Sequence, residues 1–174
     1  MKAQEFFDWC ERQGLHTNNA IATVFNVSDQ TIRNYRLRTD PDKFRETERR
    51  KREREDAKAR AEGKNPPKRR PNPHPEQLPK WIDLAVAGFE AYVRENPGMV
   101  PLFDDSYRTS QRWFEQWALR HGLDSDAKKG RALGVERAAV YNWYNRGFPG
   151  WLPLACYGYQ KLAEAGELPE EGVA

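Results

Sequence analysis

The feature that most constrains this chain is an internal repeat. When the chain is shifted by 108 residues, the segment 6–38 aligns without a gap with the segment 114–146. The identical pairs are Phe6 and Phe114, Trp9 and Trp117, Arg12 and Arg120, Gly14 and Gly122, Leu15 and Leu123, Val27 and Val135, Asn34 and Asn142, and Arg38 and Arg146. Because a repeated sequence folds into repeated units, we expect the same unit twice.

A second match follows at a shift of 70 residues. It pairs Pro79 with Pro149, Trp81 with Trp151, Leu84 with Leu154, Ala85 with Ala155, and Gly88 with Gly158. Each copy is therefore expected to end in a Pro-x-Trp entry into a helix that carries a glycine for close packing. The change of shift from 108 to 70 means that the first copy holds an insert of 38 residues.

Three short helices are predicted in the first copy, over residues 3–12, 19–26 and 28–38. Apolar residues recur in them at helical spacing, which is typical of a helix with one buried face. The expected capping residues are Thr17 or Asn18, Ser28 and Gly14. Asn26 and its counterpart Gly134 are residue types that readily adopt a positive φ, so a tight turn is predicted between the second and third helices.

The segment 18–37 therefore reads as two helices around a tight turn. Its buried face is formed by Ile21, Phe25, Val27, Ile32 and Tyr35, and Ala22 is small enough for a close crossing. These features resemble the helix-turn-helix superfamily of Cro and λ-repressor type. The resemblance implies an all-α fold in which the second helix of the motif enters the major groove of DNA.

The predicted fold class is all-α, with two similar four-helix modules that each contain a helix-turn-helix. The first module spans residues 1–95 and holds a long charged, partly helical and proline-rich insert, 39–77, between its third and fourth helices. A connector, 96–110, leads to the second module, 111–165, and residues 166–174 are expected to fray. The connector residues expected to pack between the modules are Met99, Val100, Leu102 and Phe103.

The resemblance implies that outward residues of the third helix of each module contact DNA. In the first module these are Ser28, Asp29, Gln30, Arg33 and Asn34, with Arg36 and Arg38 nearer the phosphates. In the second module they are Arg137, Ala138, Tyr141, Asn142 and Asn145, with Arg146 nearer the phosphates. Asn and Gln bond adenine edges and Arg bonds guanine, whereas phosphate contacts set the register of the protein on DNA.

The second module departs from the first at its expected DNA face. Lys129 replaces the apolar Ile21, and Glu136 and the acids within 124–126 add negative charge. The second module is therefore expected to bind a different half-site, to bind weakly, or to dock another molecule.

The insert divides into two parts. Residues 40–62 mix both charge signs at i, i+4 spacing and lack an apolar stripe, which predicts a solvated helix. Residues 63–77 include five prolines and predict a stiff, extended tether. The insert also contains two basic clusters, 49–54 and 68–70. Two roles for the insert stay open: a solvated spacer, or a contact with the DNA backbone or with RNA.

The sequence does not favour catalysis. The three histidines, His16, His74 and His121, lie at no ligand or triad spacing, and no glycine-rich phosphate loop is present. No catalytic residue, metal or cofactor is therefore expected. The two cysteines are expected to be buried thiols and the six tryptophans core residues, and no apolar run is long enough to span a membrane. A cytoplasmic, nucleoid-associated protein is expected.

The expected function is sequence-specific binding of double-stranded DNA by a transcriptional regulator, a repressor of phage or mobile-element type. The protein would read an imperfect inverted repeat, as a monomeric pseudo-dimer or a homodimer. Two alternatives stay open. One is a phage-type inhibitor that docks a host protein partner through its helix-turn-helix modules, and the other is an RNA binder that uses the arginine-rich insert.

Overall fold

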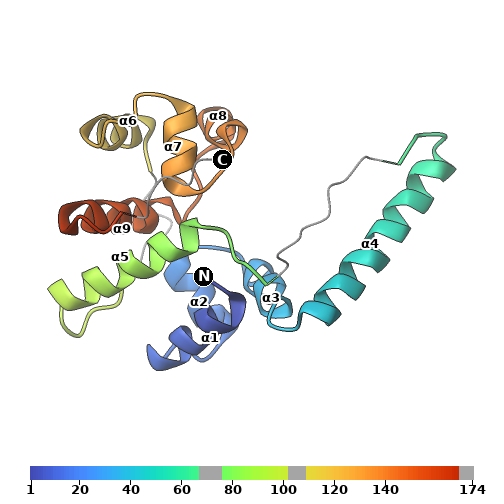
Figure 1. The fold of residues 1–174 in the computed structure, drawn as a ribbon, viewed down its shortest axis with the longest axis horizontal. Helices are drawn as coiled ribbons and strands as arrows, with labels where there is room; N and C mark the ends of the chain where they lie inside the picture. The colour runs from blue at the N-terminus through green and yellow to red at the C-terminus, as the bar shows by residue number, and fades with distance from the viewer. Residues whose placement is uncertain (67–75, 102–108, 169–174) are drawn as a thin grey trace.

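The computed structural model describes residues 1–66, 76–101 and 109–168, and this part of the chain is all-helical (Figure 1). Its helices are α1 (Ala3–Arg12), α2 (Asn18–Phe25), α3 (Asp29–Leu37), α4 (Pro41–Ala61), α5 (Trp81–Glu95), α6 (Gln111–Arg120), α7 (Asp126–Leu133), α8 (Arg137–Arg146) and α9 (Leu152–Ala165). In these ranges no helix is long and apolar enough to cross a membrane.

The capping residues predicted for the first three helices are confirmed. Thr17 and Ser28 each accept a hydrogen bond, at 3.1 Å, from the backbone N–H three residues further along the chain. Gly14 follows α1 with a φ of 76°, and α2 ends at Asn26 with a φ of 46°. Gly134 ends α7 with a φ of 69°, so both predicted left-handed turns are present.

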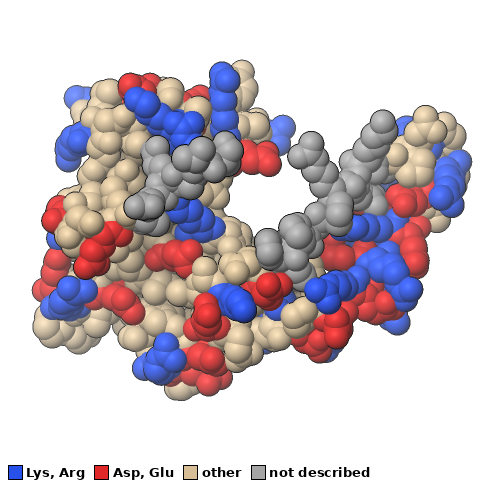
Figure 2. Space-filling view, in the orientation of Figure 1, with Lys and Arg blue, Asp and Glu red and all other residues tan. Residues whose placement is uncertain are grey.

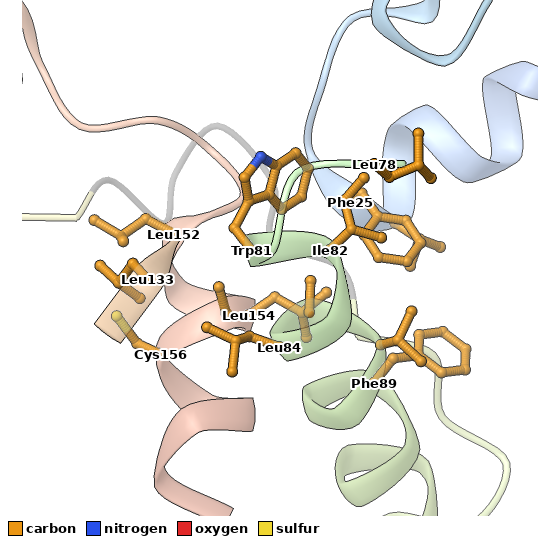
Figure 3. Packing of buried hydrophobic residues seen from close by; sticks show 14 of the residues in the cluster. Phe25, Leu78, Trp81, Ile82, Leu84, Phe89, Leu133, Leu152, Leu154 and Cys156 are labelled. Carbon is orange, nitrogen blue, oxygen red and sulfur yellow. The ribbon is translucent and has the colours of Figure 1, made fainter. Parts of the chain in front are cut away.

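α5 and α9 pack against each other at the centre of the molecule. They run in the same direction, with α1–α3 on one side of the pair and α6–α8 on the other (Figure 1). Trp81 and Trp151 stack where the two helices begin, with ring centroids 4.5 Å apart. Further along, Lys161 Nζ forms an ion pair with Glu95 Oε1 at 2.8 Å. Figure 3 shows Leu84 and Leu154 between the two helices.

Two glycines allow α5 and α9 to cross closely. A Cβ atom on Gly88 would overlap the carbonyl oxygen of Leu154, and one on Gly158 would overlap the carbonyl oxygen of Leu84. The two contacts are reciprocal. Gly158 lies 70 positions after Gly88, and Leu154 lies 70 positions after Leu84, so each glycine meets the counterpart of the other glycine's partner. Reciprocal contacts of this kind are those of a two-fold interface.

The same reciprocity recurs where the turns meet the central helices. The turn residue Asn26 leaves no room for a Cβ atom on Gly150, and Lys80 leaves none for a Cβ atom on Gly134. Asn26 and Gly134 are 108 positions apart, whereas Lys80 and Gly150 are 70 apart. Each left-handed turn therefore rests on the segment that leads into the central helix of the other half of the chain.

The aromatic core repeats its geometry in the two halves. The rings of Trp9 and Phe89 meet edge to face at 5.2 Å and 82°, and those of Trp117 and Tyr159 do so at 5.5 Å and 73°. The tryptophans that are buried in the core or packed against it are Trp9, Trp81, Trp113, Trp117, Trp143 and Trp151. The prediction that the tryptophans are core residues is confirmed for Trp9, Trp81 and Trp117, whereas the other three are partly buried and pack against the core.

The two ends of the insert are held together where it leaves the helical body, and this junction is called the closed base of the insert. Arg38, which follows α3, donates a hydrogen bond from Nη1 to the carbonyl oxygen of Gln77 at 2.6 Å. Leu78 N in turn donates to the carbonyl oxygen of Met1 at 3.1 Å. From this base α4 projects away from the other helices and buries none of its residues, which confirms the predicted solvated helix (Figure 1).

The prediction that the connector packs between the modules is wrong for Met99 and Val100. Met99 is 59% exposed and Val100 is 47% exposed, so neither packs between the two halves. The reason is that α5 and α9 already fill that interface with their own side chains. Leu102 and Phe103 lie outside the described residues, as do the prolines of the tether from residue 67 on and the tail from residue 169 on.

Candidate functional site

α3 carries an exposed polar face directly after the left-handed turn. Ile32 is 1% exposed and anchors the helix, while Gln30, Arg33 and Asn34 are exposed. Gln30 Nε2 donates to Asn34 Oδ1 at 3.0 Å, and Arg33 Nε pairs with Asp29 Oδ2 at 2.5 Å. Both pairs join residues four apart, the spacing at which helix side chains meet. The structure thus brings four predicted site residues together over two turns.

This face offers the donors and acceptors that base edges require. An amide presents a donor beside an acceptor, and a guanidinium presents a fork of donors. Such groups bond adenine and guanine in the major groove, which is wide enough for a helix. Ser28 has another task, since its hydroxyl caps α3 and lies 2.8 Å from Thr31 Oγ1. Ser28 therefore positions the face that the other residues form.

The two arginines at the end of α3 make tertiary contacts. Arg36 Nε donates to Asn18 Oδ1 at 3.0 Å, and its guanidinium lies 4.2 Å from the ring centroid of Phe7. Arg38 donates to the Gln77 carbonyl and thereby closes the base of the insert. Sequence spacing does not reveal these contacts, because the partners are far away along the chain.

α8 also presents an exposed face, but of different chemistry. The predicted site residues on it are Arg137, Ala138, Tyr141, Asn142, Asn145 and Arg146, and all six are exposed. The side chain of Asn145 donates to the carbonyl oxygen of Tyr141 at 3.2 Å. Tyr141 is itself 62% exposed. The face of α8 therefore mixes amide and guanidinium groups with an exposed aromatic ring.

Lys129, the residue in place of Ile21, is accommodated inside the second half. It is only 9% exposed, and its Nζ lies 2.9 Å from Tyr144 Oη and 3.4 Å from Asp126 Oδ1. Burial lowers the pKa of Lys129, but the hydrogen bonds to Tyr144 and Asp126 outweigh it and leave that pKa raised. The lysine thus neutralises one of the acids expected to oppose DNA.

The basic cluster of α4 is partly neutralised within its own helix. Glu46 forms ion pairs with Arg49 at 2.5 Å and with Arg50 at 2.8 Å. Hydrogen bonds from these two arginines lower the pKa of Glu46. Figure 2 shows positive and negative side chains interspersed along the projecting helix. The second basic cluster, 68–70, lies outside the described residues.

A groove of about 360 Å³ lies at the junction of α3 and α4. Arg33 and Arg36 line it from α3, and Lys43 lines it from the first turn of α4. The sequence patterns did not single out Lys43, because it is one of many cations in the insert. Only its place beside the end of α3 distinguishes it from the others.

The thiols are buried as predicted. Burial raises the pKa of Cys10 to about 12 and raises that of Cys156 well above its usual range. His121 lies between the rings of Trp117 and Tyr159, at 5.2 and 5.4 Å, and burial lowers its pKa. Across the residues that the structure describes, no group of three His, Cys, Asp or Glu side chains is placed to hold a metal ion.

No protein-family model, no curated protein and no solved structure matches this chain. A functional interpretation therefore depends on the geometry and chemistry of its own residues. The features that stand out are the exposed faces of α3 and α8 and the basic groove beside α3.

Proposed function

We propose that this chain is a sequence-specific regulator that binds double-stranded DNA, of the phage or mobile-element repressor type. One observation carries the proposal. α3 and α8 each follow a short helix and a left-handed turn, and each exposes a face that includes amide and guanidinium groups. A helix presented in this way fits the major groove and can bond base edges.

The proposal treats the chain as two copies of one four-helix module. The first copy would consist of α1–α3 and α5, with α4 inserted, and the second of α6–α9. The reciprocal glycine contacts between α5 and α9 support this division. Because the pairing surface is already occupied within one chain, the protein would bind DNA as a monomeric pseudo-dimer.

In the first module, Gln30 and Asn34 would bond adenine and Arg33 would bond guanine. Asp29 holds Arg33 at 2.5 Å and so orients its guanidinium for this contact. Ser28 would act through the helix cap. Arg38 would act through the base of the insert rather than through a phosphate.

In the second module, Asn142 and Asn145 would bond adenine, and Arg137 guanine. Ala138 and Tyr141 would meet the methyl groups of thymine, and Arg146 a phosphate. Since the two faces differ, the operator would be an imperfect inverted repeat. The half-sites of a two-fold pair lie about 10 bp apart or at a multiple of that spacing. The protein would act by occupying this operator, without catalysis or a cofactor.

Selection of bound duplexes from a random pool tests the proposal. The full chain should enrich one motif with two unequal half-sites. A pool that shows no enrichment above non-specific binding would contradict the proposal.

One observation favours a second candidate, the docking of a protein partner. Tyr141 is 62% exposed on α8, and Leu119 is 68% exposed on α6. Exposed apolar side chains of this kind are common at protein interfaces. Salt separates the two candidates, because DNA affinity falls steeply as the salt concentration rises, whereas apolar docking does not.

A further inference from the structure

The groove at the α3–α4 junction concentrates positive charge. Its lining includes three cations, Arg33, Arg36 and Lys43, and one carboxylate, Asp40. Asp40 is already engaged, since its Oδ1 accepts a hydrogen bond from the backbone N–H of Lys43 at 3.0 Å. The groove also lies at the N-terminus of α4, where the helix dipole adds partial positive charge. This surface suits an anion.

The two arginines of the groove are held in place before any ligand arrives. Arg36 is fixed through Nε by Asn18 and stacks on Phe7. Arg33 is fixed through Nε by Asp29. In the described part of the chain, no hydrogen bond engages the terminal nitrogens of Arg36. Those nitrogens form a fork that matches two oxygens of a phosphate.

We propose that this groove binds one phosphate of the DNA backbone, with Arg36 and Lys43 as its ligands. The inference rests on the proposed function, because it places the phosphate beside the bases that α3 would read. Arg33 lines the edge of the groove, and its guanidinium, held by Asp29, is left for the proposed base contact. α4 therefore serves the first half-site through its first turn, although the rest of that helix projects away.

The cations that line this groove are not repeated in the second half of the chain. Positions 108 further on hold Tyr141 in place of Arg33, Tyr144 in place of Arg36 and Asp126 in place of Asn18. Tyr144 and Asp126 are both bonded to Lys129. No insert follows α8, so Lys43 has no counterpart. The additional phosphate contact therefore belongs to one half-site only, and the protein footprint extends further on that side.

The substitution Lys43→Gln tests the proposal in the full chain. Lys43 is exposed, and only its backbone N–H donates to Asp40, the residue that caps α4, so the variant keeps the fold. Lys58→Gln is a matched control, because it makes the same change on the same helix, about 22 Å further along. Affinity for the selected duplex is measured against salt concentration. Lys43→Gln should reduce the slope of log affinity against log salt by about one, and Lys58→Gln should leave it unchanged.

Ethylation interference on the same duplex gives a second readout. In the wild-type chain, ethylation of one phosphate beside the half-site read by α3 should weaken binding. In Lys43→Gln, but not in Lys58→Gln, ethylation of that phosphate should no longer weaken it. If the slope and the interference pattern stay unchanged while specific binding persists, the groove proposal is wrong and the proposed function stands.

Inorganic phosphate separates failure of the groove from failure of the proposed function. Titration of the isotope-labelled protein, followed at the Nε–H signal of Arg36, should show a saturable shift that Lys43→Gln abolishes. Saturation without any duplex preference in the wild-type chain would overturn the DNA function and keep the groove as an anion site. Absence of saturation together with an unchanged salt slope would overturn the groove proposal.

Discussion

The indole rings of Trp81 and Trp151 stack in parallel, with centroids 4.5 Å apart and planes inclined by 11°. The two residues occupy the same position in the repeat, 70 residues apart. Each tryptophan therefore packs against its own counterpart, as equivalent residues do at the axis of a two-fold interface. On the proposed function, an axis through this stack relates the start of α5 to the start of α9 and also relates the two DNA-reading helices.

The close crossing of α5 and α9 predicts a loss of stability in Gly158→Ala. In a helix interior this substitution ordinarily stabilises by about 0.5–1 kcal/mol. Here the new Cβ atom would overlap the carbonyl oxygen of Leu84, so we expect a loss of roughly 1–3 kcal/mol in the free energy of unfolding. Urea denaturation measures this difference.

Gln116→Ala, on the exposed side of α6, serves as the control and should change the free energy of unfolding by less than about 0.5 kcal/mol. A Gly158→Ala variant as stable as the wild type would show that the two helices do not cross as described.

Arg33→Ala tests the base contact proposed for α3. The variant should lose roughly 1–3 kcal/mol of affinity for the preferred duplex and should tolerate any base at one position. Competition binding with duplexes changed one base pair at a time measures both effects. Arg94→Ala, at the far end of α5, is the matched control. An equal loss on every duplex would reassign Arg33 to the phosphate backbone.

Local chemistry made the helices predictable. Thr17, Ser28, Asn26 and Gly134 act on their immediate neighbours, so their patterns predict helix ends and turns without knowledge of the tertiary fold. The repeat added the fourth helices through its Pro-x-Trp motifs. For the same reason α4, whose charges pair within one helix, was predictable as a solvated element.

Contacts between distant segments were not predictable. Arg36 and Arg38 look like free cations in the sequence, yet one bonds Asn18 and the other bonds Gln77. Lys129 looks like a disruption of an apolar position, yet a tyrosine fifteen residues further on satisfies it. Such outcomes depend on which side chains the folded chain brings within a few ångströms, and sequence spacing does not encode that.

The closed base of the insert predicts that the insert is dispensable for folding. In the second half, Arg146 leads directly into Gly147, whereas Arg38 reaches Gln77 only through a hydrogen bond. Replacing residues 39–75 by two glycines should change the free energy of unfolding by no more than about 1 kcal/mol, because α4 buries no residue and loop entropy varies slowly with length. Urea denaturation checks this.

The same deletion separates a DNA reader from an RNA binder. The shortened chain should keep its preference for the selected duplex and lose only the additional phosphate contact. Loss of all nucleic-acid binding would instead favour recognition through the arginines of the insert.

Lys129 predicts a specific dependence of stability on pH. Its pKa is raised in the folded state, so its charge stabilises the fold below the unfolded pKa of about 10.4, and this contribution is lost as the pH rises through the folded pKa. The stability difference between wild type and Lys129→Met should therefore shrink above about pH 10.

Denaturant titrations at a series of pH values follow that difference. Lys128→Met, at a more exposed neighbour, is measured alongside as the control substitution. If the stability difference between wild type and Lys129→Met stays constant over this pH range, Lys129 acts only through the packing of its methylene groups.

The most direct test of a two-fold pair of reading helices is guanine-methylation interference on the duplex selected by the full chain. We expect two clusters of major-groove contacts with centres about 10 bp apart, or a multiple of that spacing, and Arg33→Ala should remove contacts from one cluster only. A single cluster, or interference spread evenly along the duplex, would contradict the proposal that one chain presents two DNA-reading helices.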